Sequence, residues 1–444
     1  MFNCNKNPKF CLKLLTYRLI PQFIKNDLFY QLGMYSQIKE KPSSFLEIIK
    51  EIYLNNNIEI IKKNFFNLNL KEQKQLLKII SSINPYLALK YYEKLKMNDN
   101  LKNALILYCE NKNLYNDKKP DSKMLFNLYN FYLKNSKKNK KSQFNKLLKN
   151  DELKIILKKE LNIEKLNLNK PFYIDNIKEL DIKEKSLKET TKEITIIITV
   201  YNEEKLILHS LESIINQIYK NLRIIIVDDF STDKTLDVSR GTFEKNNFTN
   251  YLIIRNLQNY GTYISRNIAL KYVQSEYIGF QDADDYSFST RIEQQIELME
   301  NNNKIASYCN LLRIKENGEI FSKNIYPLSR MAHISMIVKK DVISKIGYFK
   351  NDRIGNDSEY FERIKTFIDK NATIKLNKVL LLAAQRKNSL TTHKNTGVEE
   401  FGINSLRINL WEKWREEHLN NIKNNKYYID FNEKDYEYEI LHNK

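Results

Sequence analysis

The stretch that decides the fold reads ITIIITVYNEE over residues 194–204, LRIIIVDDFSTD over 222–233 and YIGFQDADD over 277–285. Each of these apolar runs ends abruptly in acidic or hydroxyl residues. In a parallel α/β sheet the carboxyl ends of the strands meet at one crevice, where ligands bind. Carboxylates gathered there repel one another unless a cation lies between them. The pattern therefore predicts a site for a metal ion and an anionic ligand.

Apolar strands and amphipathic helices alternate from Glu193 onward. The expected strands cover residues 194–200, 222–227, 251–255 and 277–281, with a helix after each of the first three. The apolar face of the first of these helices carries Ile207, Leu211, Ile214, Ile215 and Ile218. This order predicts a parallel sheet that is covered by helices on both faces.

Residues 1–165 are predicted to form an all-α region, either a bundle or an array that resembles helical repeats. Ser44 to Glu47 has the pattern of a capping box, and Asn84-Pro85 places a proline at a first helical position. Asp99 is suited to cap a further helix. This region carries no recognisable chemistry, so we expect it to offer a surface to a protein partner.

Charge and cysteine content limit the classes of partner and compartment. The chain has 73 Lys and Arg against 54 Asp and Glu, a net charge of +19, but the excess is diffuse and follows no nucleic-acid-binding motif. The dense basic run from Lys134 to Lys141 suits a solvated helix end or a contact with anionic lipid. Four scattered cysteines indicate reduced thiols. With neither a signal-peptide pattern nor an apolar run of ~18 residues, the expectation is a cytoplasmic protein, with peripheral attachment to the inner face of the membrane as the alternative.

Several motifs in order carry a resemblance to a known family. They are TVYNEE at 199–204, VDDFSTD at 227–233, NYG at 259–261 leading into SRN at 265–267, DAD at 282–284, and more weakly KIGYF at 345–349 and GNDSE at 355–359. Together they make residues 193–392 resemble a family 2 glycosyltransferase, whose members are inverting enzymes of the GT-A fold. The resemblance implies a transferase domain at 193–392. Composition and apolar periodicity add a helical domain at 1–165, a linker at 166–192, and an amphipathic helix and tail at 393–444.

The resemblance assigns the acidic pair at 282–284 to metal binding. Asp284 would ligate Mn²⁺ or Mg²⁺ directly, and Asp282 would contact the ribose or the metal. A hard cation prefers carboxylate oxygen, and a bound metal stabilises the charge on a departing diphosphate. The alternative is a solvated acidic turn that caps the next helix, and Asp285 fits such a cap.

The resemblance assigns the first two strand ends to the nucleotide. Thr199, Tyr201 and Glu203 would hold the nucleobase and ribose, because a ring can stack on a base and a carboxylate accepts hydrogen bonds from hydroxyls. Asp229 would read the base, which favours a UDP donor. Phe230 stands where the family usually has glycine, so the shape of this turn is open.

The remaining candidates come from later in the chain. Arg266 would pair with phosphate oxygens or with the neighbouring acidic cluster. Asp357 matches the family's catalytic base, with Glu359 as the second choice and a simple helix cap as the alternative. His393 would contact the diphosphate or metal, or else have no role in a loop.

The function expected from these residues is metal-dependent, inverting transfer of a sugar from a nucleotide-sugar, of UDP type, to a glycan or lipid-linked acceptor in cell-surface polysaccharide synthesis. A sugar nucleotidyltransferase is one alternative, but it usually needs a glycine-rich phosphate loop near its start. The other is a non-catalytic scaffold with a degenerate transferase domain. The carboxylates at 282, 284 and 357 favour an enzyme.

Overall fold

The computed structural model describes residues 29–30, 34–39, 43–55, 57–99, 101–102, 105, 192–315, 320–321, 329–369, 371–386, 405–424 and 426–443. Most of the expected linker, the basic run at 134–141 and His393 lie outside these residues. Within the described parts, none of the helices combines the length and the apolar character needed to cross a membrane.

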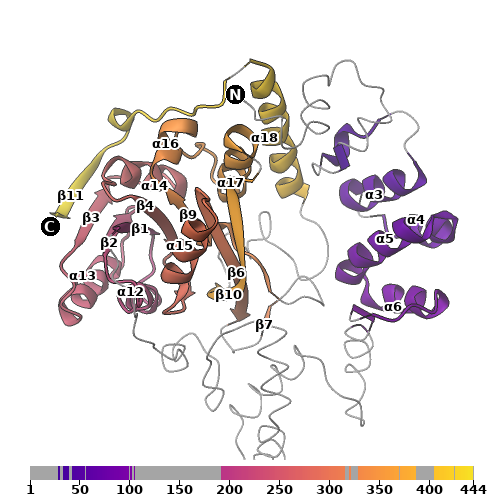
Figure 1. The fold of residues 1–444 in the computed structure, drawn as a ribbon, viewed down its shortest axis with the longest axis horizontal. Helices are drawn as coiled ribbons and strands as arrows, with labels where there is room; N and C mark the ends of the chain where they lie inside the picture. Colours follow the sequence, from indigo (N-terminus) through magenta and orange to yellow (C-terminus); the bar gives the residue numbers. More distant parts are fainter. Residues whose placement is uncertain are drawn as a thin grey trace, which may run out of the picture. The chain divides into compact units, whose positions relative to one another are not determined.

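The chain divides into two compact units. One is helical and joins the N-terminal helices to a helix near the C-terminus (Figure 1). Its longer elements are α3 (Ser44–Asn55), α4 (Glu59–Asn64), α5 (Leu70–Ile83), α6 (Pro85–Lys94) and α18 (Ser405–Asn424). Leu419 of α18 is buried in the same hydrophobic cluster as Ile48, Leu76 and Leu77, so a helix from late in the chain helps to build this unit. The expected N-terminal helical region is confirmed.

Two helix starts in this unit follow the sequence signals. α6 begins at Pro85, and the Asn84 side chain accepts a hydrogen bond from Leu87 N at 3.1 Å. Asp99 Oδ1 accepts a hydrogen bond from Lys102 N at 2.9 Å, as expected of a capping carboxylate. These caps satisfy backbone N–H groups at the helix starts that have no partner within the helix.

The capping box expected at Ser44 is wrong by one residue. Ser44 is already helical, and Ser43 Oγ accepts the hydrogen bond from Leu46 N at 3.4 Å. A reciprocal capping box stands at α5 instead, where Asn69 and Glu72 each accept from the other's backbone N–H. A short pattern fixes a helix start only to within a residue when two serines adjoin.

The second unit is built on one mixed sheet with the strand order β11-β3-β2-β1-β4-β9-β6-β10-β5. Its strands include β1 (Ile194–Val200), β2 (Leu222–Asp228), β3 (Tyr251–Asn256), β4 (Tyr277–Asp282), β5 (Tyr286–Ser287), β6 (Ala306–Lys315), β9 (Ile337–Lys339), β10 (Thr373–Gln385) and β11 (Tyr438–Asn443). β1 pairs in parallel with β2 and β4, and β2 pairs in parallel with β3. Thr199 faces Val227 on one side and Asp282 on the other, so the strand ends lie level.

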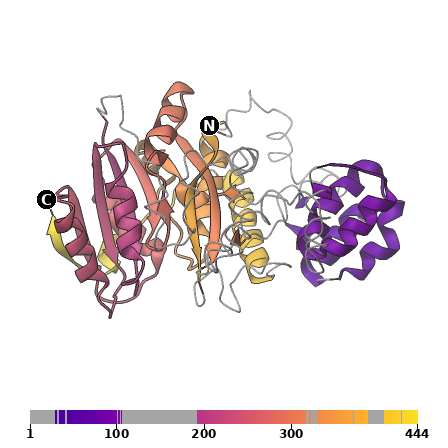
Figure 2. The ribbon, with the colours of Figure 1, turned by 90° about the horizontal axis from the view of Figure 1, so that it is seen from below.

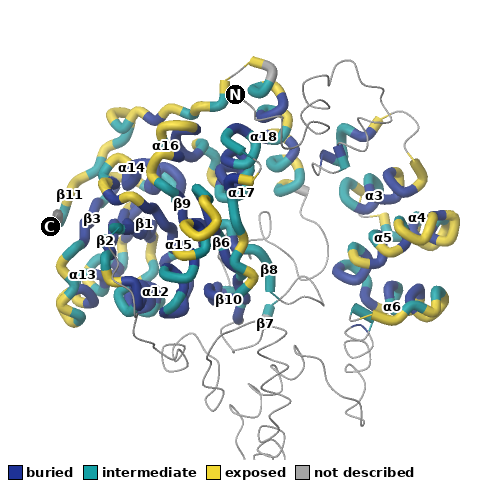
Figure 3. The backbone as a smooth tube through the Cα atoms, in the orientation of Figure 1, coloured by how far each residue is buried: buried dark blue, intermediate teal, exposed yellow. Residues whose placement is uncertain are grey.

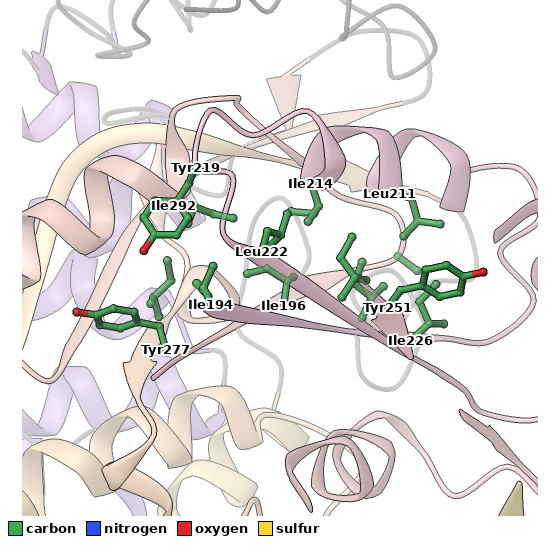
Figure 4. Close-up of a cluster of buried hydrophobic side chains, with 14 of the residues drawn as sticks. Ile194, Ile196, Leu211, Ile214, Tyr219, Leu222, Ile226, Tyr251, Tyr277 and Ile292 are labelled. Atoms are coloured by element: carbon green, nitrogen blue, oxygen red, sulfur yellow. The ribbon is translucent and has the colours of Figure 1, made fainter. Parts of the chain in front are cut away.

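Helices cover both faces of the parallel part (Figures 1 and 2). They are α12 (Ile207–Ile215), α13 (Thr235–Lys245), α14 (Thr262–Lys271) and α15 (Arg291–Asn301). α12, α13 and α15 contribute Leu211, Phe243 and Ile292 to one cluster with alternate residues of β1 and β2 (Figure 4). α14 packs on β1 and β2 as well. Every residue of β1 is buried, as expected for a central parallel strand (Figure 3).

Beyond β4 the sheet is no longer parallel throughout. β9 lies between β4 and β6 and runs antiparallel to both, and β10 is parallel to β6. At the opposite edge, β11 pairs antiparallel with β3, so the end of the chain covers an edge strand that would otherwise expose its backbone. The expectation of a mostly parallel sheet therefore holds for β1 to β4, and the rest is mixed.

Candidate active site

The ends of β1 and β2 are tied together by side chains. Asn202 N donates to Ser231 Oγ at 2.9 Å, and Asn202 Oδ1 accepts from Thr232 N at 2.9 Å. Glu203 N donates to Thr235 Oγ1 at 2.8 Å. These bonds cross from one strand end to the next, so they fix the two turns as one surface.

The three residues expected to hold the nucleoside differ in exposure. Tyr201 is 48% exposed, and its ring is available to a ligand. Glu203 is half-buried. Thr199 is buried, and its hydroxyl lies 2.6 Å from that of Thr262, the first residue of α14. Tyr201 is thus the member of this group best placed to meet a base.

The turn after β2 has a residue in an unusual conformation. Asp228 is fully buried and accepts Ser231 N at 3.2–3.3 Å, so it holds the turn from inside. Burial raises the pKa of the Asp228 carboxyl. Phe230 has φ +73°, in the left-handed region where glycine is unstrained, and its side chain is 42% exposed. The turn keeps a glycine-like backbone although the residue is phenylalanine.

Asp229 is 4% exposed and binds the chain's own backbone. Its Oδ1 accepts from Asn256 Nδ2 at 2.8 Å and from Tyr260 N at 2.9 Å, and its Oδ2 accepts from Gly261 N at 2.7 Å. These charge-assisted bonds fix the turn that leads into α14. In this structure the Asp229 carboxylate therefore binds the turn, which is not the base-reading role expected for it. A base that contacted this carboxylate would have to share Oδ2 with Gly261 N.

The acidic residues after β4 crowd together. Asp284 and Asp285 line a small hollow with His209, Tyr286, Ile314, Leu382 and Ala383. Loss of hydration and the charges of Asp357 and Asp284 raise the pKa of Asp282 to about 6, although the charge of Arg266 acts in the opposite direction. Burial, with the charges of Asp284 and Asp282, raises the pKa of Asp285 well above its usual range. Such crowding is what a cation would relieve.

The carboxylates at this site suit a hard divalent cation, but they do not enclose one. Among the described residues, no group of three histidine, cysteine, aspartate or glutamate side chains is arranged to hold a metal ion. Asp282 and Asp284 supply carboxylate oxygens, the ligands that Mg²⁺ and Mn²⁺ accept, and Mg²⁺ usually takes few protein ligands beside substrate phosphates. These two residues fit a metal that the diphosphate of a ligand helps to hold.

Arg266 lies between two carboxylates. It is 2% exposed, its Nη2 donates to Asp282 Oδ1 at 2.8 Å, and its Nη1 donates to Asp357 Oδ1. Burial alone would lower the pKa of Arg266, but the charges of Asp357 and Asp282 outweigh it and raise the pKa. Of the two roles expected for Arg266, the structure displays pairing with the acidic cluster.

Three aromatic rings surround the same guanidinium. Its carbon lies 5.3 Å from the ring centre of Tyr263, 5.7 Å from that of Phe280 and 5.8 Å from that of Phe349. Tyr263 also donates its hydroxyl to Asp357 Oδ2 at 3.2 Å. The sequence reasoning missed Tyr263, although its place on α14 three residues before Arg266 puts both on one helix face.

The two candidate bases on α17 (Asn356–Arg363) have different surroundings. Asp357 has 28% of its side chain exposed. Glu359 is fully buried, and its carboxylate accepts from Arg363 Nε at 2.9 Å and Nη2 at 3.1 Å. Glu359 therefore stabilises the helix as a buried ion pair, a role that the sequence reasoning did not give it. Asp357 is the candidate that can reach a ligand.

One histidine outside the earlier expectations adjoins this helix. His333 Nδ1 and Ser358 Oγ are 2.9 Å apart, and burial lowers the pKa of His333. A lone histidine in a mixed strand region gives no sequence signal of this contact. The structure thus brings Arg266, Asp282 and Asp357 together, places Tyr201 on the exposed ends of the strands, and buries Glu359.

Comparison with known proteins identifies the family of this part of the chain. Residues 195–362 match Glycosyl transferase family 2. This part of the chain belongs to that family and is a glycosyltransferase domain. The GT-A type of α/β fold implied by the resemblance is confirmed by the family match together with the sheet and its flanking helices.

Named relatives cover only part of the chain and of themselves. An Escherichia coli protein, UDP-Glc:alpha-D-GlcNAc-diphosphoundecaprenol beta-1,3-glucosyltransferase WfaP, is 40% identical over 117 residues, which are 26% of this chain and 45% of that protein. The minor teichoic acid biosynthesis protein GgaB of Bacillus subtilis is 28% identical over 189 residues, 39% of this chain and 21% of that protein. The chain thus spans less than half the length of either.

A solved structure resembles the domain loosely. The crystal structure of S. aureus TarS 1-349 in complex with UDP-GlcNAc has a TM-score of 0.37 and 20% sequence identity, over 44% of this chain and 60% of that chain. A TM-score this low supports no statement about the site.

Proposed function

We propose that the protein is a metal-dependent inverting glycosyltransferase that uses a nucleotide-sugar donor. The observation that carries the proposal is that the buried guanidinium of Arg266 binds both Asp282 at the end of β4 and Asp357 on α17. The candidate donor contact and the candidate base are thereby held side by side, as a displacement at one carbon requires.

The proposed reaction assigns one proton transfer to the chain's own groups. Asp357 takes the proton of the acceptor hydroxyl as that oxygen forms its bond to the anomeric carbon, while the bond from that carbon to the diphosphate oxygen breaks. Asp357 Oδ2 accepts one hydrogen bond, from the Tyr263 hydroxyl, and its second lone pair is left for this proton. Arg266 orients Asp357 through the bond from its Nη1 to Asp357 Oδ1. A metal ion held by Asp284 and Asp282 would stabilise charge on the departing diphosphate.

The nucleoside diphosphate is proposed to be UDP, with its base against the exposed ring of Tyr201. Because Asp229 binds Asn256, Tyr260 and Gly261, this preference rests on the family resemblance more than on a visible acceptor for a uracil N–H. A panel of nucleotide-sugars, assayed for metal-dependent hydrolysis, tests the choice of base and sugar.

The proposed acceptor is a glycan or a lipid-linked saccharide. The names of the two relatives, one acting on a diphosphoundecaprenol-linked sugar and one in teichoic acid biosynthesis, support an acceptor of this class. A lipid-linked acceptor would bring the protein to a membrane surface, in keeping with the cytoplasmic and peripheral location expected from the sequence.

Calorimetry of UDP binding with and without Mn²⁺ tests the proposal. We expect wild-type protein to bind UDP in the presence of Mn²⁺ and the Asp284→Asn variant to lose the metal-dependent part. Asp237→Asn, which alters an exposed carboxylate on α13, is the matched control and should bind as wild type does. Unchanged Mn²⁺-dependent affinity in Asp284→Asn would remove Asp284 from the metal site.

A further inference from the structure

Two exposed aromatic side chains stand at neighbouring strand ends. Tyr201 follows β1 and is 48% exposed, and Phe230 follows β2 and is 42% exposed. Within residues 192–315, neither ring packs against another aromatic ring. Single exposed apolar side chains are common, but two exposed aromatic rings at the ligand-binding edge of one sheet form a candidate contact surface.

Two hydrogen bonds hold Tyr201 and Phe230 at adjacent positions of the two strand ends. Asp229 N donates to Val200 O at 2.8 Å, and Asn202 N donates to Ser231 Oγ at 2.9 Å. Tyr201 lies between these two links on one strand end, and Phe230 lies between them on the other. Since paired strands are ~4.8 Å apart, the two side chains leave the sheet from adjacent positions.

The conformation of Phe230 points to a function and not to packing. Its φ of +73° is strained for a phenylalanine and would be relaxed for a glycine. The neighbours keep that conformation in place, because Asp228 binds Ser231 N inside the turn and Asp229 binds Gly261 N. Strain that the surroundings enforce, on a side chain that is then left exposed, is typical of ligand-binding positions.

We propose that Phe230 contacts the nucleobase of the donor and forms, with Tyr201, the aromatic surface that receives it. This inference rests on the proposed function and adds a base-contacting residue to it. Flat π-faces suit any base, and base–aromatic stacking tolerates different bases. Phe230 would therefore raise affinity for the nucleoside part and leave the diphosphate part untouched.

The test compares ligands with and without a base. UDP and inorganic pyrophosphate, each with Mn²⁺, are titrated calorimetrically into wild-type protein and into Phe230→Gly, Phe230→Leu and Phe230→Tyr. We expect Phe230→Gly and Phe230→Leu to bind UDP about tenfold more weakly, a change within the usual size of one stacking contact. Phe230→Tyr should keep wild-type affinity, and pyrophosphate should bind all four proteins alike.

Stability separates a binding role from a structural one. Phe230→Gly should melt at the same temperature as wild type or higher, because it relieves strain. Asn247→Gly is the matched control, since Asn247 is an exposed residue with φ +50° after α13, and it should leave UDP affinity unchanged.

Two outcomes overturn the inference, and they are distinguishable. If folded Phe230→Gly and Phe230→Leu bind UDP as wild type does, Phe230 does not contact the base, and the proposed function stands. If wild-type protein binds neither UDP nor GDP with Mn²⁺, the proposed function fails and this inference fails with it.

Discussion

Asp282 and Asp357 share one buried guanidinium. Nη2 of Arg266 donates to Asp282 and Nη1 donates to Asp357, and Arg266 itself is 2% exposed. The two carboxylates are 42% and 28% exposed, so they border solvent while the cation between them does not. The arginine therefore acts from behind the candidate site and orients the groups that would meet the ligands.

Substitution of Arg266 should act on stability first. In Arg266→Met the carboxylates of Asp282 and Asp357 lose their shared counter-charge, and we expect the free energy of unfolding to fall by about 3–5 kcal/mol, measured in urea. Arg266→Lys should be intermediate, because one ammonium cannot fork to two carboxylates. If Arg266 instead served as a phosphate ligand, Arg266→Lys would weaken UDP binding at wild-type stability, contrary to this expectation.

Asp357 and Glu359 are two residues apart on α17 and should respond differently to loss of charge. Asp357→Asn should lower turnover about 10²–10⁴-fold and retain metal-dependent UDP binding, because only the proton acceptor is lost. Glu359→Gln should lower the free energy of unfolding by about 3 kcal/mol, since Arg363 is then a buried unpaired cation. Its folded fraction should still turn over. A stable Glu359→Gln protein without turnover would move the base to Glu359.

The sequence predicted most accurately the features that depend on residues adjacent in the chain. The four parallel strands, the proline at the start of α6 and the acidic strand ends all follow local patterns, and the structure contains each of them. The only sequence signal of the left-handed conformation at Phe230 was that the family usually has glycine at this position. Its observed φ of +73° shows that the rest of the turn, and not the residue at 230, fixes the backbone.

The contacts that could not be predicted join residues far apart in the chain. Asp229 finds its partners 27 to 32 residues later, in Asn256, Tyr260 and Gly261. Arg266 and Asp357 meet across 91 residues. An acidic residue at a strand end looks the same in sequence whether its oxygens face a ligand or the backbone of the next turn. Only the assembled sheet distinguishes these roles.

Glu300 gives the folded protein a specific acid sensitivity. Its carboxylate accepts from the Tyr277 hydroxyl and pairs with Lys339 at 3.0 Å and Lys192 at 3.2 Å. The Tyr277 hydrogen bond and the two lysines lower the pKa of Glu300 to about 2, although partial burial acts in the opposite direction. A lowered carboxyl pKa stabilises the fold above the unfolded value of about 4.5, and this contribution is lost as pH falls toward 2.

Glu300→Gln should therefore destabilise the protein at pH 7 and make progressively less difference as pH falls toward 2. We expect about 1 kcal/mol, because the side chain is 36% exposed and solvent screens the pairs. Urea unfolding between pH 2 and pH 7 measures the difference from wild type. Glu244→Gln, on the exposed side of α13, is the control. A difference between Glu300→Gln and wild type that stays constant over this range would contradict the assignment.

Gly347 packs directly against the C-terminal segment at Ile429. It has φ +75° and ψ −146°, a region open essentially to glycine alone, and a Cβ there would lie 1.9 Å from Ile429 O. Ile429 O also accepts Tyr348 N at 2.9 Å. Gly347→Ala must therefore strain the backbone and displace residues 426–443, which lead into β11.

We expect Gly347→Ala to lower the free energy of unfolding by at least about 2 kcal/mol and to make the segment at 426–443 more susceptible to proteolysis. Gly241→Ala is the matched control, because nothing lies within 4 Å of the added Cβ and α13 should gain up to about 1 kcal/mol from the better helix former. Urea unfolding and mass analysis of limited digests measure both variants. If Gly347→Ala unfolds at the wild-type urea concentration and its tail resists cleavage, residues 426–443 do not stabilise the sheet through Gly347.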